Sequence, residues 1–289
     1  MKDPSELKIC LDRLVAQYDQ RYLDTDPLGL VHRYSDPIDV EVAGLIAASL
    51  SYGGAGIIRA SITDIFDRCG PSPSRFARDL TPDSARRVFA GFKHRWTTGN
   101  HVGWLCLAIG DVLNGYGSLG ALTMSLYNPA EEDTGGVMSR FAAHLVSSIP
   151  QDEWLEGSKV ASLSYLIPSP ERGSAAKRLA MYFRWMVRGP DGIDFGLWRF
   201  IEPSRLVIPV DRHIGRMGRL LGLTRRSVPD WRMALEITGS LRCLDPDDPV
   251  RYDFALVRPG ITGECTHVKP GDCTSCIIRD FCGDAHRHT

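Results

Sequence analysis

Apolar residues recur at intervals of three and four along most of the chain, which is the spacing of one face of an α-helix. In residues 6–22, for example, Leu7, Leu11, Leu14 and Val15 follow this spacing. Alternation with a period of two, typical of a half-buried strand, is rare, and no convincing strand is found. The pattern therefore predicts an all-α fold.

Turn signals rich in Pro, Gly and Asp separate the helical segments. A turn is predicted at DTDPLGL, residues 24–30, and two helices broken at Gly53-Gly54 are predicted between residues 36 and 69. Further helices are expected over residues 74–92, as a pair over 102–126, and over 137–148, 175–188 and 208–223.

Composition is that of a soluble globular protein. The length of 289 residues allows one large domain or two small ones. The N-terminal segment carries charges throughout, so no signal peptide is expected. The longest apolar run, residues 42–58, is short for a membrane span and is typical of a buried helix. Cys10, Cys69, Cys106 and Cys243 are scattered singly, as reduced thiols are. We therefore expect a cytoplasmic protein without a membrane partner.

Charge is distributed unevenly, although the net charge is only −1. Residues 172–226 hold twelve Lys or Arg against four Asp or Glu. A basic segment on a nearly neutral protein suits a localised site for a polyanion. The alternative is a solvated helix face with counterions.

Four cysteines crowd into residues 265–282, at Cys265, Cys273, Cys276 and Cys282. Disulfides would suit a small secreted domain better than this long chain. Zinc sites more usually combine two Cys-x-x-Cys pairs, and only one is present. One such pair flanked by longer gaps can also supply four thiolates to an iron–sulfur cluster. An iron–sulfur cluster is favoured, with zinc and a purely structural role without a metal as the alternatives.

Two helix starts carry candidate chemistry. The turn at Gly173-Ser174 precedes the helix predicted from residue 175, and exposed N–H groups with the positive end of a helix dipole can bind phosphate. Asp211 follows Pro209 at the start of another helix, where a capping carboxylate belongs. An ordinary helix start and a plain cap are the alternatives.

Several motifs resemble those of the helix-hairpin-helix DNA glycosylases, the superfamily of endonuclease III. CTSCIIRDFC, residues 273–282, is similar to the loop that holds the 4Fe-4S cluster in that family. PVDRHIGR, residues 209–216, resembles the PVDxHxxR segment, and YDFALVRPGITGEC, residues 252–265, resembles the helix that leads to the first cysteine. The Gly173-Ser174 turn takes the place of the hairpin, without its usual Leu-Pro-Gly-x-Gly pattern. The whole chain resembles a divergent bacterial branch of unassigned function.

This resemblance implies two helical domains with a DNA groove between them. Residues 36–204 would form a helical barrel, and residues 1–35 plus 205–289 would form a second domain with the cluster loop. Asp211 would be the catalytic carboxylate. Lys177, with Arg178 as its cationic neighbour, would be the amine that forms a Schiff base in bifunctional members. The alternative for Lys177 is a phosphate contact or an ordinary surface lysine.

The implied function is base-excision repair: removal of a damaged base, expected to be oxidised, from duplex DNA, with or without lyase activity. The alternatives are a non-catalytic iron–sulfur protein that binds nucleic acid and a redox protein. A monomer associated with the nucleoid is expected. Trp185, Trp198 and Phe200 are candidates for base stacking or for core packing. The DNA contacts expected are Arg172, Gly173, Ser174, Arg178, Arg212, Arg216, His267 and Lys269.

Overall fold

The computed structural model describes residues 3–148, 159–265, 273 and 276–283, and this part of the chain is predominantly helical. The all-α prediction is confirmed. The first half contains α1 (Pro4–Gln17), η1 (Gln20–Thr25), α2 (Pro27–Val31), α3 (Pro37–Leu50), α4 (Ala55–Cys69), α5 (Pro73–Asp79), α6 (Pro82–Val88), β1 (Lys93–His94), β2 (Thr97–Thr98), α7 (Gly99–Tyr116), α8 (Leu119–Leu126) and α9 (Gly135–Ser147). The second half contains α10 (Lys159–Leu166), η2 (Pro170–Arg172), α11 (Lys177–Val187), η3 (Pro203–Arg205), α12 (Arg212–Leu220), α13 (Trp231–Arg242), α14 (Asp253–Ile261) and η5 (Arg279–Phe281).

Many helices begin at a proline that follows a capping side chain. Asp26 accepts a hydrogen bond from the Leu28 N–H at 2.9 Å, and Asp36 caps α3 in the same way. Proline suits the first helical position because its missing N–H has no partner there in any case. This chemistry makes residues 27–31 a short helix, so the turn predicted over residues 24–30 is wrong in its second half.

Two other predictions are corrected. The single helix expected over residues 74–92 is broken, because Thr81 caps a new helix at Pro82. The absence of strands is also wrong: β1 and β2 form a hairpin of two residues each, too short to show an alternating pattern.

The core is built around α3 and α11. Helix α3 is buried over nearly its whole circumference. It approaches α11 closely at Gly44, where a Cβ atom would lie 2.9 Å from Met186 Cε. The indoles of Trp185 and Trp198 are each only 1% exposed, so both pack in the core.

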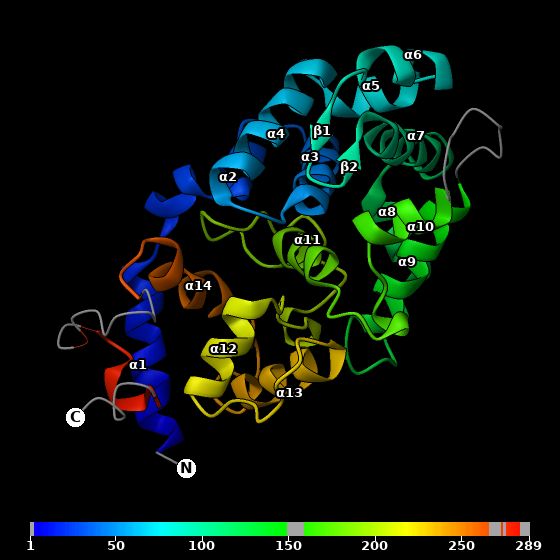
Figure 1. The fold of residues 1–289 in the computed structure, drawn as a ribbon. Coiled ribbons are helices and arrows are strands. Elements are labelled where there is room, and N and C mark those ends of the chain that lie inside the picture. The colour runs from blue at the N-terminus through cyan, green and yellow to red at the C-terminus, as the bar shows by residue number, and fades with distance from the viewer. Residues whose placement is uncertain (1–2, 149–158, 266–272, 274–275, 284–289) are drawn as a thin grey trace.

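Figure 1 shows α2 to α11 in one group, with α1, α12, α13 and α14 below them. Helix α1 packs on α14, and Cys10 Sγ donates to the Ile277 carbonyl oxygen at 3.0 Å. The N-terminal helix therefore lies against the C-terminal region. Helix α2 packs on α3 and α4. The domain division at residues 36 and 205 stays a prediction.

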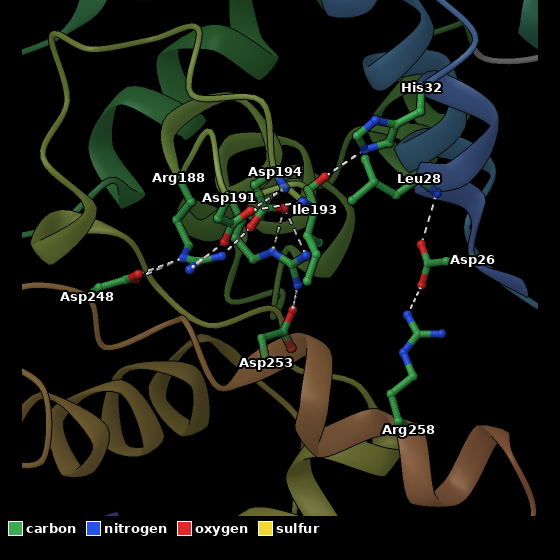
Figure 2. Close-up of polar contacts among 11 residues, drawn as sticks. Asp26, Leu28, His32, Arg188, Asp191, Ile193, Asp194, Asp248, Asp253 and Arg258 are labelled. Carbon is green, nitrogen blue, oxygen red and sulfur yellow. Dashed lines mark hydrogen bonds and ion pairs between the residues drawn. The ribbon is translucent and has the colours of Figure 1, made fainter. Parts of the chain in front are cut away.

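Buried ion pairs join α11 to α14. Arg184 of α11 pairs with Asp194 at 3.0 Å and with Asp253 at the start of α14. Arg188 pairs with Asp194, Asp191 and Asp248 (Figure 2). These arginines belong to the basic segment of residues 172–226, so part of the positive charge of this segment is neutralised in ion pairs that stabilise the fold.

A second buried arginine anchors α14 to α2. Arg258 is fully buried and pairs with Asp26, the carboxylate that also caps α2 (Figure 2). Its guanidinium lies 3.8 Å from the centre of the Phe254 ring.

Among the described helices, none is long and apolar enough to cross a membrane alone, and only the bent pair α7 and α8 meets the length and composition criteria for a membrane span.

Candidate functional site

Lys177 and Asp211, the two predicted catalytic residues, form an ion pair. Lys177 Nζ lies 3.1 Å from Asp211 Oδ2, and the two side chains are 32% and 27% exposed. Lys177 is the first residue of α11, and Asp211 is the residue before α12. The pair therefore joins two helix starts that are 34 residues apart in the sequence.

A strained turn positions Lys177. Gly173 has a φ of +75°, and Ala176, the residue before the helix, has a φ of +45°. A left-handed conformation costs an L-residue about 1–2 kcal/mol, so the surrounding structure must impose it. The Ser174 hydroxyl accepts from the Ala176 N–H at 3.1 Å, and the Ser174 backbone bridges to Asp230. These contacts hold the turn that sends Lys177 toward Asp211.

Asp211 is held by both of its carboxylate oxygens. Oδ1 accepts the backbone N–H groups of His213 at 2.8 Å and Ile214 at 3.0 Å, which is the predicted helix cap. Burial alone would raise the pKa of Asp211, but Lys177 and the Ile214 N–H outweigh burial and hold this pKa below its ordinary value. The carboxylate is therefore ionised at neutral pH and has a fixed orientation.

The ion pair lies in a cleft of about 1000 Å³. Loop 51–54, the β1–β2 hairpin, residues 164–178 and residues 211–213 contribute to its walls. Among the described residues that line the cleft, Asp211 is the only carboxylate. Five basic side chains line it: Arg95, Arg172, Lys177, Arg178 and Arg212. The cleft thus has a positive balance that the whole chain lacks.

Arg178 forms part of one wall. Its guanidinium carbon lies 5.1 Å from the ring centre of Tyr52 and 4.7 Å from that of Tyr165. It donates to the carbonyl oxygens of Ser49, at 3.2 Å, and Tyr165. Burial lowers the pKa of the Arg178 guanidinium from its ordinary value. Arg178 is thus bonded to the protein, and its predicted phosphate contact stays a prediction.

The other predicted DNA contacts fall into three groups. Arg172, Ser174 and Arg212 line the cleft, and Gly173 lies in the turn between the first two. Arg216 lies close enough to Cys265 to affect the pKa of its thiol. His267 and Lys269 lie outside the described residues.

Sequence reasoning missed the β1–β2 hairpin as part of the site. Its two turn residues, Arg95 and Trp96, both line the cleft, and Trp96 is 70% exposed. The turn lacks the Asn-Gly or Asp-Gly signal of tight hairpins. The only available signal was a tryptophan in the polar segment KHRWTT, residues 93–98.

The four clustered cysteines lie near one another. Burial and then the neighbouring thiols Cys276, Cys282 and Cys273 raise the pKa of Cys265 to about 11. All four are partly exposed. A set of four thiols fits the ligands of an iron–sulfur cluster or zinc in number and chemistry. Within the described part of the chain, no three or more His, Cys, Asp or Glu side chains are arranged as ligands of a metal ion.

Comparison with known proteins places the chain in one family. No curated protein and no solved structure matches it. Residues 26–262 match the family model described as "Protein of unknown function (DUF2400)". The match includes Lys177, Asp211 and the hairpin, and ends before Cys265. Since it covers most of the sequence, the chain belongs to the DUF2400 family, whose function is unknown.

Proposed function

We propose that this protein is a DNA base-excision glycosylase that removes a damaged base, with an oxidised base as the expected substrate. The observation that carries the proposal is the contact between Lys177 and Asp211 inside a cleft lined by five basic side chains. The motifs that resemble the helix-hairpin-helix glycosylases support it.

Asp211 would stabilise the positive charge that develops on the sugar. When the N-glycosidic bond breaks, the bonding electron pair leaves with the base, which also takes up a proton. Water then adds to C1′ and loses a proton. A carboxylate that is ionised and fixed in orientation before the reaction suits this role, because it needs no rearrangement as charge develops.

Lys177 would carry the lyase activity. Its amine would attack C1′, displace the base with its electron pair and form a Schiff base after opening of the sugar ring. This step requires Lys177 to leave the ion pair and to give up a proton. Substrate entering between the two side chains would separate them.

The basic side chains would hold the DNA backbone. Arg172 and Arg212 are exposed at the cleft, and the Gly173-Ser174 turn lies beside them. Charges of this kind neutralise phosphates and make binding depend on salt concentration. Cys265, Cys273, Cys276 and Cys282 would hold the 4Fe-4S cluster, or zinc as the alternative, and the metal centre would brace the C-terminal region.

A non-catalytic DNA-binding protein is the second candidate. The observation that favours it is that Asp211 already has structural roles for both oxygens, as the cap of α12 and as the partner of Lys177. A scaffold that had lost its chemistry could keep both contacts. Such a protein would bind DNA in the same cleft and release no base.

Borohydride trapping on duplexes that carry single oxidised bases or an abasic site tests the lyase. We expect a covalent adduct with the wild type and none with Lys177→Ala. Lys8→Ala is the matched control, because Lys8 forms a Lys–Asp ion pair with Asp12 outside the cleft, also at about 3 Å. An adduct that survives Lys177→Ala would exclude Lys177 as the nucleophile.

Base release measured on the same duplexes tests the glycosylase. Asp211→Asn should abolish release and preserve binding, because asparagine keeps the helix cap but removes the charge. Asp19→Asn is the matched control: Asp19 also caps a helix and pairs with an arginine, Arg21, and it does not line the cleft. No base release by the wild type from any lesion would favour the non-catalytic candidate.

A further inference from the structure

Trp96 stands at the tip of the β1–β2 hairpin at the cleft. The strands pair Lys93 with Thr98 and His94 with Thr97, so Arg95 and Trp96 make up the whole turn. Trp96 is 70% exposed, more than any other large apolar side chain in the described residues. Tryptophan is usually largely buried, and an exposed indole at the cleft is available for contact with a ligand.

The hairpin is held firmly by the residues beneath it. Two strands of two residues are not stable alone. The buried His94 places Nε2 at 3.0 Å from the Tyr52 carbonyl oxygen and Nδ1 at 2.9 Å from Ser61 Oγ. The Tyr52 hydroxyl donates to the His94 carbonyl oxygen at 3.0 Å and lies 2.6 Å from Thr97 Oγ1. These contacts fix the backbone of the hairpin that carries Trp96 before any ligand binds.

Backbone strain in the hairpin turn also indicates that the position of this turn is specific. Arg95 has a φ of +53°, a left-handed conformation that L-residues rarely adopt. Its side chain crosses Gly53, where an added Cβ would lie 3.1 Å from Arg95 Cδ. Gly53 itself has a φ of +111°. Strain of this kind persists where a local geometry is needed, and here it lies in the turn that brings Arg95 and Trp96 to the cleft.

The surroundings of Trp96 combine aromatic faces with positive charge. Tyr165 is 43% exposed on the same cleft, and the Arg178 guanidinium lies near the rings of both Tyr52 and Tyr165. Arg172 and Arg212 also line this cleft. Proteins that bind unpaired bases use this combination: aromatic rings stack on bases, and arginines hold phosphates.

We propose that Trp96 stacks on a nucleobase that lacks its partner in the duplex. The cleft would therefore prefer DNA with an unpaired nucleotide over fully paired DNA. The proposal rests on the proposed binding of DNA in this cleft, but it requires no base release. Stacking on an aromatic side chain is worth about 1–3 kcal/mol per base, which corresponds to about 5- to 150-fold in Kd.

Equilibrium binding to two labelled duplexes that differ only by a one-nucleotide bulge tests this proposal. We expect the wild type to bind the bulged duplex about tenfold or more tightly, within the range for one stacked base. Trp96→Ala should reduce the difference to about twofold or less and leave the Kd for paired DNA nearly unchanged. Trp96→Phe should retain most of the preference. Tyr116→Ala is the matched control, because Tyr116 is an exposed aromatic residue that does not line the cleft.

A fluorescent base analogue in the bulge gives a second measurement. Its emission should fall when the wild type binds, because the base stacks on the indole, and should not fall with Trp96→Ala. The proposal is overturned if the wild type shows no preference, if Trp96→Ala keeps it, or if Trp96→Ala weakens both duplexes equally.

The binding result can be separated from the glycosylase assay. If the preference depends on Trp96 but no lesion is released, the glycosylase proposal fails and the stacking site stands. If bases are released and Trp96→Ala keeps the preference, the glycosylase stands and the stacking site fails.

Discussion

The carboxylate of Asp211 caps α12 with one oxygen and pairs with Lys177 through the other. Both contacts favour the charged form, which explains why the pKa of Asp211 is lowered despite burial. The same two contacts orient the group. At the residue scale, therefore, helix capping prepares the electrostatics that the proposed reaction needs.

The lowered pKa of Asp211 predicts a pH dependence of stability. A carboxyl group with a lower pKa in the folded state stabilises the fold above its unfolded pKa, about 4, and loses this contribution as pH falls through the folded value. Wild type should therefore exceed Asp211→Asn in free energy of unfolding at pH 7, and the gap should close below about pH 4. Urea denaturation across this range measures it. In a Lys177→Met background the gap at pH 7 should shrink; an unchanged gap would show that Lys177 contributes nothing.

The cap at Asp211 could be predicted from the sequence, since Pro209 and the helical spacing after it mark a helix start. The partnership with Lys177 could not. It depends on how α11 packs against α12, and a separation of 34 residues contains no information on that. The resemblance brought both residues into one hypothesis, and the structure shows them in contact.

Buried arginines join the helices at the element scale. Arg184 is 4% exposed at its side chain and pairs with Asp194 and Asp253, which are buried as well. It holds α11, which begins with Lys177, against the start of α14. Removing the guanidinium takes from the buried Asp253 its ion-pair partner and leaves the buried Asp194 paired with Arg188.

Arg184→Met should therefore lower the free energy of unfolding by about 3–5 kcal/mol, the cost of breaking a buried ion pair. Chemical denaturation at neutral pH measures this loss. Arg75→Met is the control, because Arg75 and Asp79 form an exposed pair at 3.8 Å that should contribute less than about 1 kcal/mol. Equal losses in the two variants would contradict the structural role of Arg184.

The crossing of α3 and α11 depends on the missing side chain at Gly44. Gly44→Ala should cost about 1–3 kcal/mol, because the new Cβ would meet Met186 Cε at 2.9 Å and Tyr182 Cε2 at 3.3 Å. Gly239→Ala in α13 is the opposite case: nothing lies within 4 Å of its Cβ, so it should add about 0.5–1 kcal/mol. Thermal or urea unfolding of the pair of variants shows whether the signs differ. Two effects of the same sign would rule out the close packing.

At the scale of the whole molecule, the C-terminal region closes against the N-terminal helix through Cys10 and Ile277. Cys276, one of the four clustered thiols, lies beside this contact and is among the groups that raise the pKa of Cys10. A metal centre bound there would tie the two ends of the sequence together.

Purified protein should be brown, with about four irons per chain, if the four cysteines hold the proposed cluster. Cys276→Ser should lose the colour and the iron. Cys243→Ser should keep both, because Cys243 is exposed and is not one of the four clustered cysteines. Colourless wild type with one zinc per chain would instead establish the zinc alternative.

The sequence by itself determined the helical class, the break at Gly53-Gly54, the cap at Asp211 and the crowding of four cysteines, because each depends on residues close together in the chain. Only the tertiary structure decided that Lys177 contacts Asp211 and that Arg184 and Arg188 form buried ion pairs. It also decided that a two-residue turn brings Trp96 to the cleft. These outcomes depend on the packing of segments far apart in the chain. The same periodicity and motif spacing are compatible with many ways of packing these helices. The sequence pattern therefore could not predict which distant side chains would come into contact.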